Sequence, residues 1–174
     1  MPRIPTRAQC LELLKKYKLP DNVIAHLTEV NRIAMELARK INARGHHVNL
    51  ELVDAASLLH DIDKMQSLEG GNHGVLSRKI LETEGYPEVA KIAESHVLHN
   101  IIPPGRLPGI EAKIVFYADK RVKHDKVVSI DERFKYLRER YPQYLENINR
   151  AEPLTKKLEK ELMELAGTSK IYMG

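Results

Sequence analysis

The sequence predicts an all-α protein, and three observations support this prediction. Apolar residues recur in steps of three and four along most of the chain, which is the repeat of an amphipathic helix. Residues that begin or end helices, such as Thr6, Asn49 and Gly45, stand at the edges of these repeats. No segment shows a sustained alternation of apolar and polar residues, and no linker or internal repeat divides the chain. We therefore expect one helical domain over residues 1–174.

Two helices are predicted at the start of the chain. Thr6 and Gln9 form a capping box before a short helix that ends near residues 19–20. Asp21 is expected to cap a long helix, whose apolar stripe alternates steps of four and three. Gly45 ends this helix, because glycine readily adopts the left-handed conformation that follows helix C-termini.

Three shorter helices are expected in the middle of the chain, over about residues 49–65, 72–84 and 87–96. Asn49 caps the first of them, and a pair of glycines separates the first from the second. Pro87 stands in the first turn of the third helix, where its missing N–H and fixed φ are tolerated.

The C-terminal part begins with an irregular stretch rich in proline and glycine, residues 101–109. A helix that carries apolar residues from 114 to 122 follows, and a second helix lies behind a capping box that starts at Ser129. Residues 141–166 are amphipathic, and we expect Pro153 to interrupt their helix.

Composition narrows the class of protein. Apolar residues make up 43% of the chain and charged residues 30%, as in ordinary globular proteins. No apolar run approaches the roughly 20 residues that cross a bilayer, and the N-terminus lacks the apolar core of a signal peptide. Cys10 is the single cysteine, which excludes an internal disulfide and fits a reducing compartment. We therefore expect a cytoplasmic protein that does not act at a membrane.

The net charge of +4 is mild. It favours an anionic ligand such as a phosphate ester, because opposite charge steers diffusional encounter. Most of the excess lies in lysine-rich helical stretches that read as solvated faces. No basic block with interleaved aromatic residues predicts a nucleic-acid platform. A small phosphorylated molecule is therefore the expected partner, and a homodimer stays open.

Polar residues on apolar helix faces are the most informative feature. His26, His60 and Asp119 each lie three or four residues from apolar positions on the same predicted face. A carboxylate in a helical core is costly unless something pairs with it. A single core histidine usually hydrogen-bonds a backbone carbonyl, but several such residues on successive helices indicate a shared buried cation.

The adjacent pair His60–Asp61 makes this pattern specific. The sequence resembles the HD-domain superfamily of metal-dependent phosphohydrolases, whose pattern is a histidine, a His-Asp doublet and a distant aspartate. His26, the doublet and Asp119 match these elements in order. The resemblance covers residues 21 to about 125 and implies an HD-domain helical bundle, with residues 126–174 as a C-terminal helical extension.

The resemblance also implies a metal centre. His73 and His96 stand in the contexts where dinuclear members carry two further histidines, so two ions are expected, with Asp61 bridging them. Imidazole and carboxylate ligands without thiolates suit Fe, Mn, Co, Ni or Zn. The two additional histidines could instead lie exposed at helix ends or bind substrate phosphate. The full expected ligand set is His26, His60, Asp61, His73, His96 and Asp119.

Further residues are assigned to catalysis and substrate binding. Lys64 lies one helical turn after Asp61, so it could reach a phosphate bound at the metals, although it could also be a solvated lysine. Asp61 and Lys64 are the expected catalytic residues, and Lys64, His99 and Arg106 the expected substrate contacts. Three histidines are expected at the surface, and two charged residues either orient ligands or lie at the surface. These are His46, His47 and His124, and Asp63 and Arg121.

The implied reaction is cleavage of a phosphate ester or anhydride of a nucleotide or related small molecule, by attack of metal-bound hydroxide. The motif pattern is nearest to the dinuclear bacterial diadenosine-tetraphosphate hydrolases, but Asp119 is followed here by Lys-Arg-Val-Lys instead of Tyr-Ile-Glu-Pro. Gly-Tyr-Pro occurs at residues 85–87, where it closes the helix expected over residues 72–84, and a cyclic-dinucleotide phosphodiesterase is not the expected class. Two alternatives stay open: a dinuclear iron oxygenase of the inositol-oxygenase type and a non-catalytic nucleotide sensor.

Overall fold

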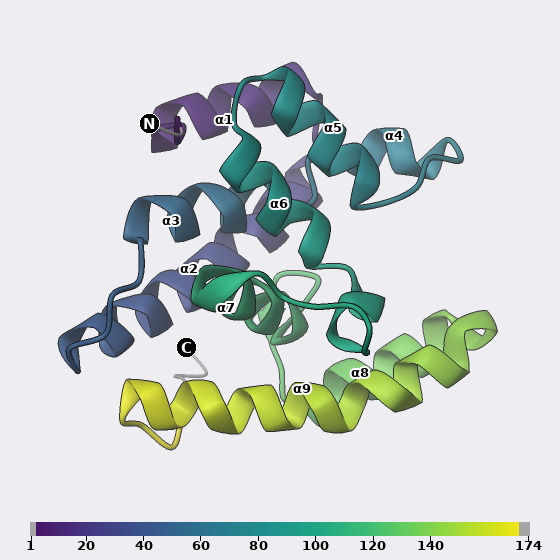
Figure 1. The fold of residues 1–174 in the computed structure, drawn as a ribbon. Helices are drawn as coiled ribbons and strands as arrows, with labels where there is room; N and C mark the ends of the chain where they lie inside the picture. The colour runs from purple at the N-terminus through teal and green to yellow at the C-terminus, as the bar shows by residue number, and fades with distance from the viewer. Residues whose placement is uncertain (1–2, 171–174) are drawn as a thin grey trace.

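The structure, a computed structural model, describes residues 3–170, and these residues are almost entirely helical (Figure 1). The all-α prediction is therefore confirmed. The helices are α1 (Arg7–Lys16), α2 (Asp21–Ala43), α3 (Leu50–Leu59), α4 (Lys64–Leu68), α5 (Val75–Thr83), α6 (Pro87–Ser95), α7 (Gly109–Lys120), α8 (Ile130–Arg140) and α9 (Leu145–Ala166). Shorter elements are the 3₁₀ helices η1 (Leu98–Ile101) and η2 (Pro142–Tyr144) and the strands β1 (Val122–Lys123) and β2 (Lys126–Val127).

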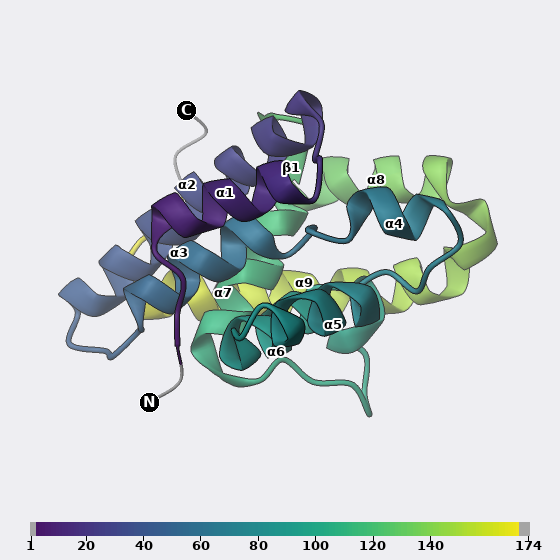
Figure 2. The same cartoon turned by 90° about the horizontal axis from the view of Figure 1, so that it is seen from above.

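Helix α2 lies at the centre of the bundle and packs against α3, α7 and α9. Its inward stripe, which includes Leu27, Val30, Ala34, Leu37 and Ile41, is fully buried, as the spacing of these residues predicts. The pair α5 and α6 covers another side, and α6 packs on α3 and α7. Seen from above, α6 lies beside α7 (Figure 2).

The C-terminal helices form an antiparallel pair along the bundle (Figure 1). Helix α9 contacts α2, α7 and α8, and it buries Ile148, Leu158 and Leu162 in these contacts. The same apolar core therefore continues from the N-terminal helices into the C-terminal extension. Among the described residues, no helix combines the length and apolar character needed to cross a membrane.

The predicted caps are confirmed at several helices. Thr6 and Gln9 form a reciprocal capping box at α1, and Ser129 and Glu132 form another at α8. The Asn49 side chain accepts a hydrogen bond from the Leu52 N–H at the start of α3. These side chains satisfy backbone N–H groups that have no partner within the helix.

The cap expected at Asp21 is wrong. Pro20 is the N-cap residue of α2, and Asp21 is the first helical residue, where its charge still complements the helix dipole. Helix α1 also ends earlier than expected, at Lys16, and α5 begins only at Val75, after Gly74.

The helix expected over residues 49–65 is interrupted at the His-Asp doublet. Helix α3 ends at Leu59, and residues 60–63 form a tight turn before α4. Adjacent residues on a continuous helix point in directions about 100° apart. The turn removes this restriction, so His60 and Asp61 can both face the interior.

Two predictions for the C-terminal part are also wrong. Val122 lies in β1 of a short hairpin instead of a helix, because α7 ends at Lys120. Helix α9 continues through Pro153. Both Pro153 and Asn149, whose carbonyl loses its helical partner, lie on the exposed face, so water can satisfy this carbonyl.

Candidate metal centre

The structure brings the six residues of the expected ligand set together inside the bundle. Histidine and aspartate atoms group there so closely that three groups of three could each hold an ion, with ligand atoms within 4.8 Å of one another. Two groups consist of expected ligands, and the third joins Asp61 and His73 with Asp63. Four of the six residues are at least nine-tenths buried. The residues come from His26 of α2, His60 after α3, Asp61 in the following turn, His73 before α5, His96 after α6 and Asp119 of α7.

The first group surrounds Asp119. Its Oδ1 atom lies 3.0 Å from Nε2 of His26 and 3.5 Å from Nε2 of His60. His60 is fully buried, and its Nε2 atom has no hydrogen-bond partner among the described residues. A buried polar atom without a partner is costly, and a cation between these atoms would remove that cost.

The second group surrounds Asp61. Its Oδ1 atom lies 3.2 Å from Nε2 of both His73 and His96, and these two nitrogens lie 3.1 Å apart. Asp61 also forms a group with His60 of the first group and with His96, whose ligand atoms all lie within 4.8 Å of one another. Asp61 therefore stands between the two groups, where the expected bridging ligand would lie.

A hydrogen bond from Nδ1, on the side of the ring away from the centre, fixes the orientation of each of the four histidines. Nδ1 of His60 donates to the Ser57 carbonyl, and Nδ1 of His96 donates to the Ala93 carbonyl. Nδ1 of His26 donates to a backbone carbonyl as well, and Nδ1 of His73 donates to Asp63. Because these oxygens only accept hydrogen bonds, each neutral ring presents its Nε2 lone pair toward the centre. The donor set therefore fits divalent cations.

The pKa values of His73 and His96 indicate which of the two rings carries a proton when no cation is bound. Burial opposes protonation of His73, but the carboxylates of Asp61 and Asp63 outweigh it and raise the His73 pKa to about 9. Burial lowers the His96 pKa to about 4. A proton on Nε2 of His73 can therefore bridge to Nε2 of neutral His96, and a cation would replace it.

The two carboxylates are held in the charged form. Burial opposes ionisation of both, but the neighbouring positive charges of His60 and Lys120 outweigh it. The pKa values of Asp61 and Asp119 therefore lie well below their usual range. Charged carboxylates are the form that binds metal ions.

Asp63 orients one ligand of this centre, a role that the sequence left undecided. It is fully buried and accepts hydrogen bonds of 2.9 Å from Nδ1 of His73 and from the Gly74 N–H. Gly74 has a φ of +86°, and a Cβ atom there would lie 2.5 Å from Val97. Glycine is therefore needed where the chain turns from His73 into α5.

Lys120 is a residue that the sequence analysis missed. Its ammonium is buried, and it donates to Oδ2 of Asp119 and, at 3.0 Å, to the backbone carbonyl of His96. It thus joins the two ends of the centre and leaves Oδ1 of Asp119 to face the histidines. Its position directly after Asp119, four residues from the buried Phe116, was the available signal.

The predicted substrate contacts do not form a single group. Nζ of Lys64 lies 3.9 Å from Oδ2 of Asp61, and the Asp61 charge raises the Lys64 pKa. His99 and Arg106 are exposed and line a surface pocket of about 330 Å³ together with His73. Lys64 is not among the residues that line this pocket.

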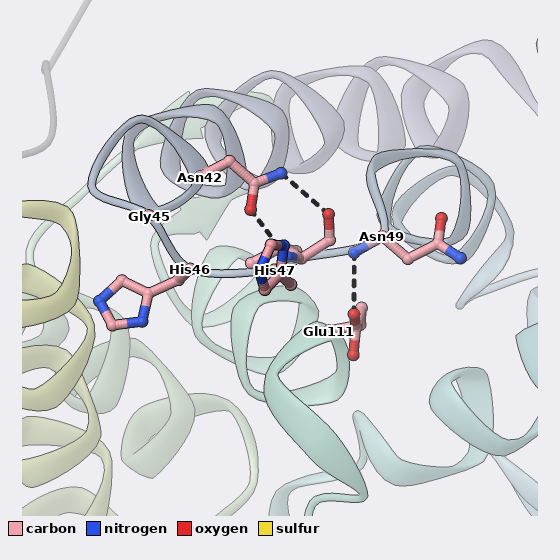
Figure 3. A pocket seen from close by; sticks show the side chains of 7 residues that line it. Asn42, Gly45, His46, His47, Asn49 and Glu111 are labelled. Atoms are coloured by element: carbon pink, nitrogen blue, oxygen red, sulfur yellow. Dashed lines mark hydrogen bonds between the residues drawn. The ribbon is translucent and has the colours of Figure 1, made fainter.

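His46 and His47 are exposed, as expected, and line a different hollow of about 500 Å³ (Figure 3). Asn42 there exchanges two hydrogen bonds with the backbone of Val48, and Glu111 accepts one from the Asn49 N–H. These side chains therefore hold the loop after α2. Asn42 is 16 residues from His26, roughly 24 Å along the helix, so this hollow is remote from the centre.

An all-α bundle with buried histidine and aspartate groups able to hold divalent cations defines the class of this protein. Residues 23–122 match the HD domain, and the chain belongs to this family. HD domains bind divalent metals and belong to a superfamily of metal-dependent phosphohydrolases.

The chain is also similar to several archaeal proteins. An uncharacterized protein of Methanocaldococcus jannaschii is 36% identical, over 76% of this chain and 84% of the relative. A protein named tRNA (cytidine(56)-2'-O)-methyltransferase from Thermoplasma volcanium is 34% identical over 74% of this chain, and one of the same name from Picrophilus torridus is 30% identical over 94%. The chain spans only 40% and 48% of these two methyltransferases. No solved structure matches the chain.

Proposed function

We propose that this protein is a metal-dependent phosphohydrolase that cleaves a phosphate ester or anhydride of a nucleotide or related small molecule. One observation carries the proposal: four histidine Nε2 atoms and two carboxylates converge in the bundle, and the buried Nε2 of His60 has no partner among the described residues. The six residues would hold two divalent transition-metal ions. When bound, such ions polarise a phosphoryl group and lower the pKa of water.

The residues around Asp61 divide the work between binding metal and binding substrate. Oδ1 of Asp61 faces His73 and His96, whereas Oδ2 faces the ammonium of Lys64. Lys64 is only partly exposed and stays protonated, because Asp61 raises its pKa. Its charge is therefore available to offset negative charge that develops on a phosphoryl group beside the metals.

The pocket next to His73 is proposed to receive the remainder of the substrate. His99 and Arg106 offer hydrogen-bond donors, and Val75, Val97 and Pro108 offer apolar surface. Its volume of about 330 Å³ lies at the small end of the range for ligand pockets. This lining suits a small molecule with an anionic part and an apolar or aromatic part, as in a nucleotide.

The narrower resemblance to diadenosine-tetraphosphate hydrolases makes dinucleoside polyphosphates the first substrates to test. The two relatives named tRNA methyltransferases make phosphorylated RNA ends a second group of substrates to test. This chain spans less than half of those proteins, so their methyl transfer is not proposed for it. The iron oxygenase predicts aerobic turnover of a polyol by the iron-loaded chain, and the nucleotide sensor predicts nucleotide binding without turnover.

The experiment incubates the full chain with nucleotides, dinucleoside polyphosphates and phosphorylated RNA ends, each with Mn, Co, Fe, Ni or Zn. Chromatography detects the release of every cleavage product, because cleavage of an anhydride between two nucleosides yields two nucleotides and no inorganic phosphate. Wild type is compared with Asp119→Asn and with the exposed control Asp21→Asn. We expect metal-dependent release by wild type and the control, and at least 100-fold less by Asp119→Asn. Equal release by Asp119→Asn, or no release from any substrate with any metal, would contradict the proposal.

A further inference from the structure

The orientation of His26 depends on a hairpin that follows the last metal-binding helix. Nδ1 of His26 donates a 2.7 Å hydrogen bond to the backbone carbonyl of His124, which directs Nε2 toward Asp119. His124 has a φ of +56°, in the left-handed region that residues other than glycine rarely adopt. Such a conformation persists only where the surrounding structure holds it.

Arg121 forms two hydrogen bonds with Val128 at the base of this hairpin. Its Nε atom donates to the Val128 carbonyl at 2.6 Å, and its own carbonyl accepts from the Val128 N–H at 2.8 Å. In the chain between Arg121 and Val128, strands β1 and β2 pair Val122 with Val127 and Lys123 with Lys126. The position of the His124 carbonyl is therefore set by Arg121 and this short ladder.

Helix α9 in turn holds Arg121. Nη1 of Arg121 donates to the Tyr117 hydroxyl at 2.6 Å and to Oε1 of Glu159 at 3.2 Å. The Tyr117 hydroxyl also donates to this Oε1 atom, at 2.6 Å. The guanidinium of Arg121 is buried, and a buried cation needs an anion nearby, which Glu159 of α9 supplies.

We infer that α9 positions the metal ligand His26 through a brace that consists of Glu159, Arg121 and the hairpin from Val122 to Val127. Glu159 fixes the guanidinium of Arg121, Arg121 fixes the hairpin, and the hairpin carbonyl fixes the ring of His26. Glu159 and most of the hairpin lie beyond residues 23–122, the part that matches the HD domain. The C-terminal extension would thus be part of the metal site. This inference rests on the metal-binding part of the proposed function.

The test compares two α9 carboxylates that both reach α7. Glu159→Ala removes the brace, whereas Glu161→Ala removes the 2.7 Å ion pair with Lys113, which lies outside it. The affinity of the full, metal-free chain for Co²⁺ is measured by competition with a chelator. We expect about ten-fold weaker binding in Glu159→Ala, the scale of losing support behind a ligand, and less than a two-fold change in Glu161→Ala.

A second readout reports on the His26 ring itself. The Nδ1–H proton of His26 should give a slowly exchanging imidazole signal by NMR in wild type and Glu161→Ala, and exchange faster in Glu159→Ala. His124→Gly keeps the backbone carbonyl and accepts a positive φ, so it should keep both the signal and the affinity. If Glu159→Ala does not fold, Glu159→Gln, which removes the charge and keeps the shape of the side chain, replaces it in both measurements.

The possible outcomes separate the brace from the proposed function. Equal losses of affinity in Glu159→Ala and Glu161→Ala, or an unchanged His26 signal and affinity in Glu159→Ala, would overturn the brace. Loss of affinity in His124→Gly would also overturn it, because the backbone would then not be the positioning group. Failure of wild type to bind Co²⁺ would overturn the metal centre itself, and no result depends on phosphate release.

Discussion

At the scale of single residues, Asp61 contacts both the histidines of the candidate metal centre and the proposed catalytic lysine. One of its oxygens faces two histidines and the other faces a lysine, while its neighbour His60 belongs to the Asp119 group. The side chain is almost completely buried, and its pKa lies well below the usual range, because His60, His73 and His96 outweigh the effect of burial. A carboxylate in this position can serve two cations at once.

We therefore predict that Asp61→Ala loses both ions, whereas His73→Ala loses only one. Wild type is expected to contain about two transition-metal ions per chain, following the six-ligand set. Elemental analysis of the purified, folded proteins measures this directly. Full metal content in Asp61→Ala would show that this carboxylate does not bridge, and one ion in wild type would make His73 and His96 substrate contacts.

Lys64 permits a test that separates catalysis from metal binding. A protonated lysine does not bind metals, and Lys64 lies at the edge of the centre with its ammonium toward Asp61. Lys64→Ala is expected to keep metal content and folding but to lower kcat ten-fold or more. Lys79→Ala, which removes an exposed lysine of α5, is the control. A change in KM alone would limit Lys64 to binding, and no kinetic change would make it an ordinary solvated lysine.

The pKa of His73 predicts the pH dependence of metal binding. Because this pKa is raised to about 9, the ring holds a proton at neutral pH that a cation must displace. The affinity for Mn²⁺ should therefore rise as pH increases from 6 to 8, by up to about ten-fold per pH unit for each proton released. Titration calorimetry in buffers of different ionisation enthalpy counts the protons. An affinity that stays constant over this range would contradict the assignment of His73 as a ligand.

The sequence could predict part of this site for a physical reason. His26, His60 and Asp119 stand out because polar groups on an apolar helix face require a partner. Asp63 and Lys120 stand out less, because their burial depends on which distant element packs over them. The backbone role of His124 has no sequence signal, since any residue with a carbonyl could provide it.

At the scale of elements, the sequence predicted correctly those features that depend on residues within one helical turn. It did not predict helix ends that depend on tertiary contacts. The capping boxes at Thr6 and Ser129 are local, and the structure contains both. The break after Leu59 depends instead on two neighbouring side chains reaching the same centre. Proline at position 153 is a strong local signal for a break, but contacts of α9 with α2, α7 and α8 outweigh it.

The continuity of α9 predicts that Pro153→Ala stabilises the protein. Alanine would restore the N–H that can bond the Asn149 carbonyl, and it removes the steric cost of proline in a helix interior. Proline also restricts the unfolded chain, which offsets part of the gain. We expect the free energy of unfolding in urea to rise by roughly 2 kcal/mol. Lower stability of Pro153→Ala would mean that the helix is not continuous at this position.

At the scale of the whole molecule, the metal centre is the point where four helices meet. Ligands come from α2, α7 and the ends of α3 and α6, so a bound cation would hold these segments together. Without a cation, protonated His73 and the buried ammonium of Lys120 partly compensate the charges of Asp61 and Asp119. Removal of metal should therefore weaken the fold without abolishing it.

Chelation is accordingly expected to lower the melting temperature by several degrees. For a chain of 174 residues, a loss of about 2 kcal/mol corresponds to a decrease of roughly 4–8 °C. Calorimetry of the wild type before chelation, after verified metal removal and after re-addition of metal measures the effect, because an ion that binds only the folded state adds stability with concentration. Asp61→Ala, which should bind no metal, should not respond to the chelator. An identical melting curve for metal-loaded and metal-free wild type would show that packing alone forms the site, and that the cations serve chemistry without contributing to the fold.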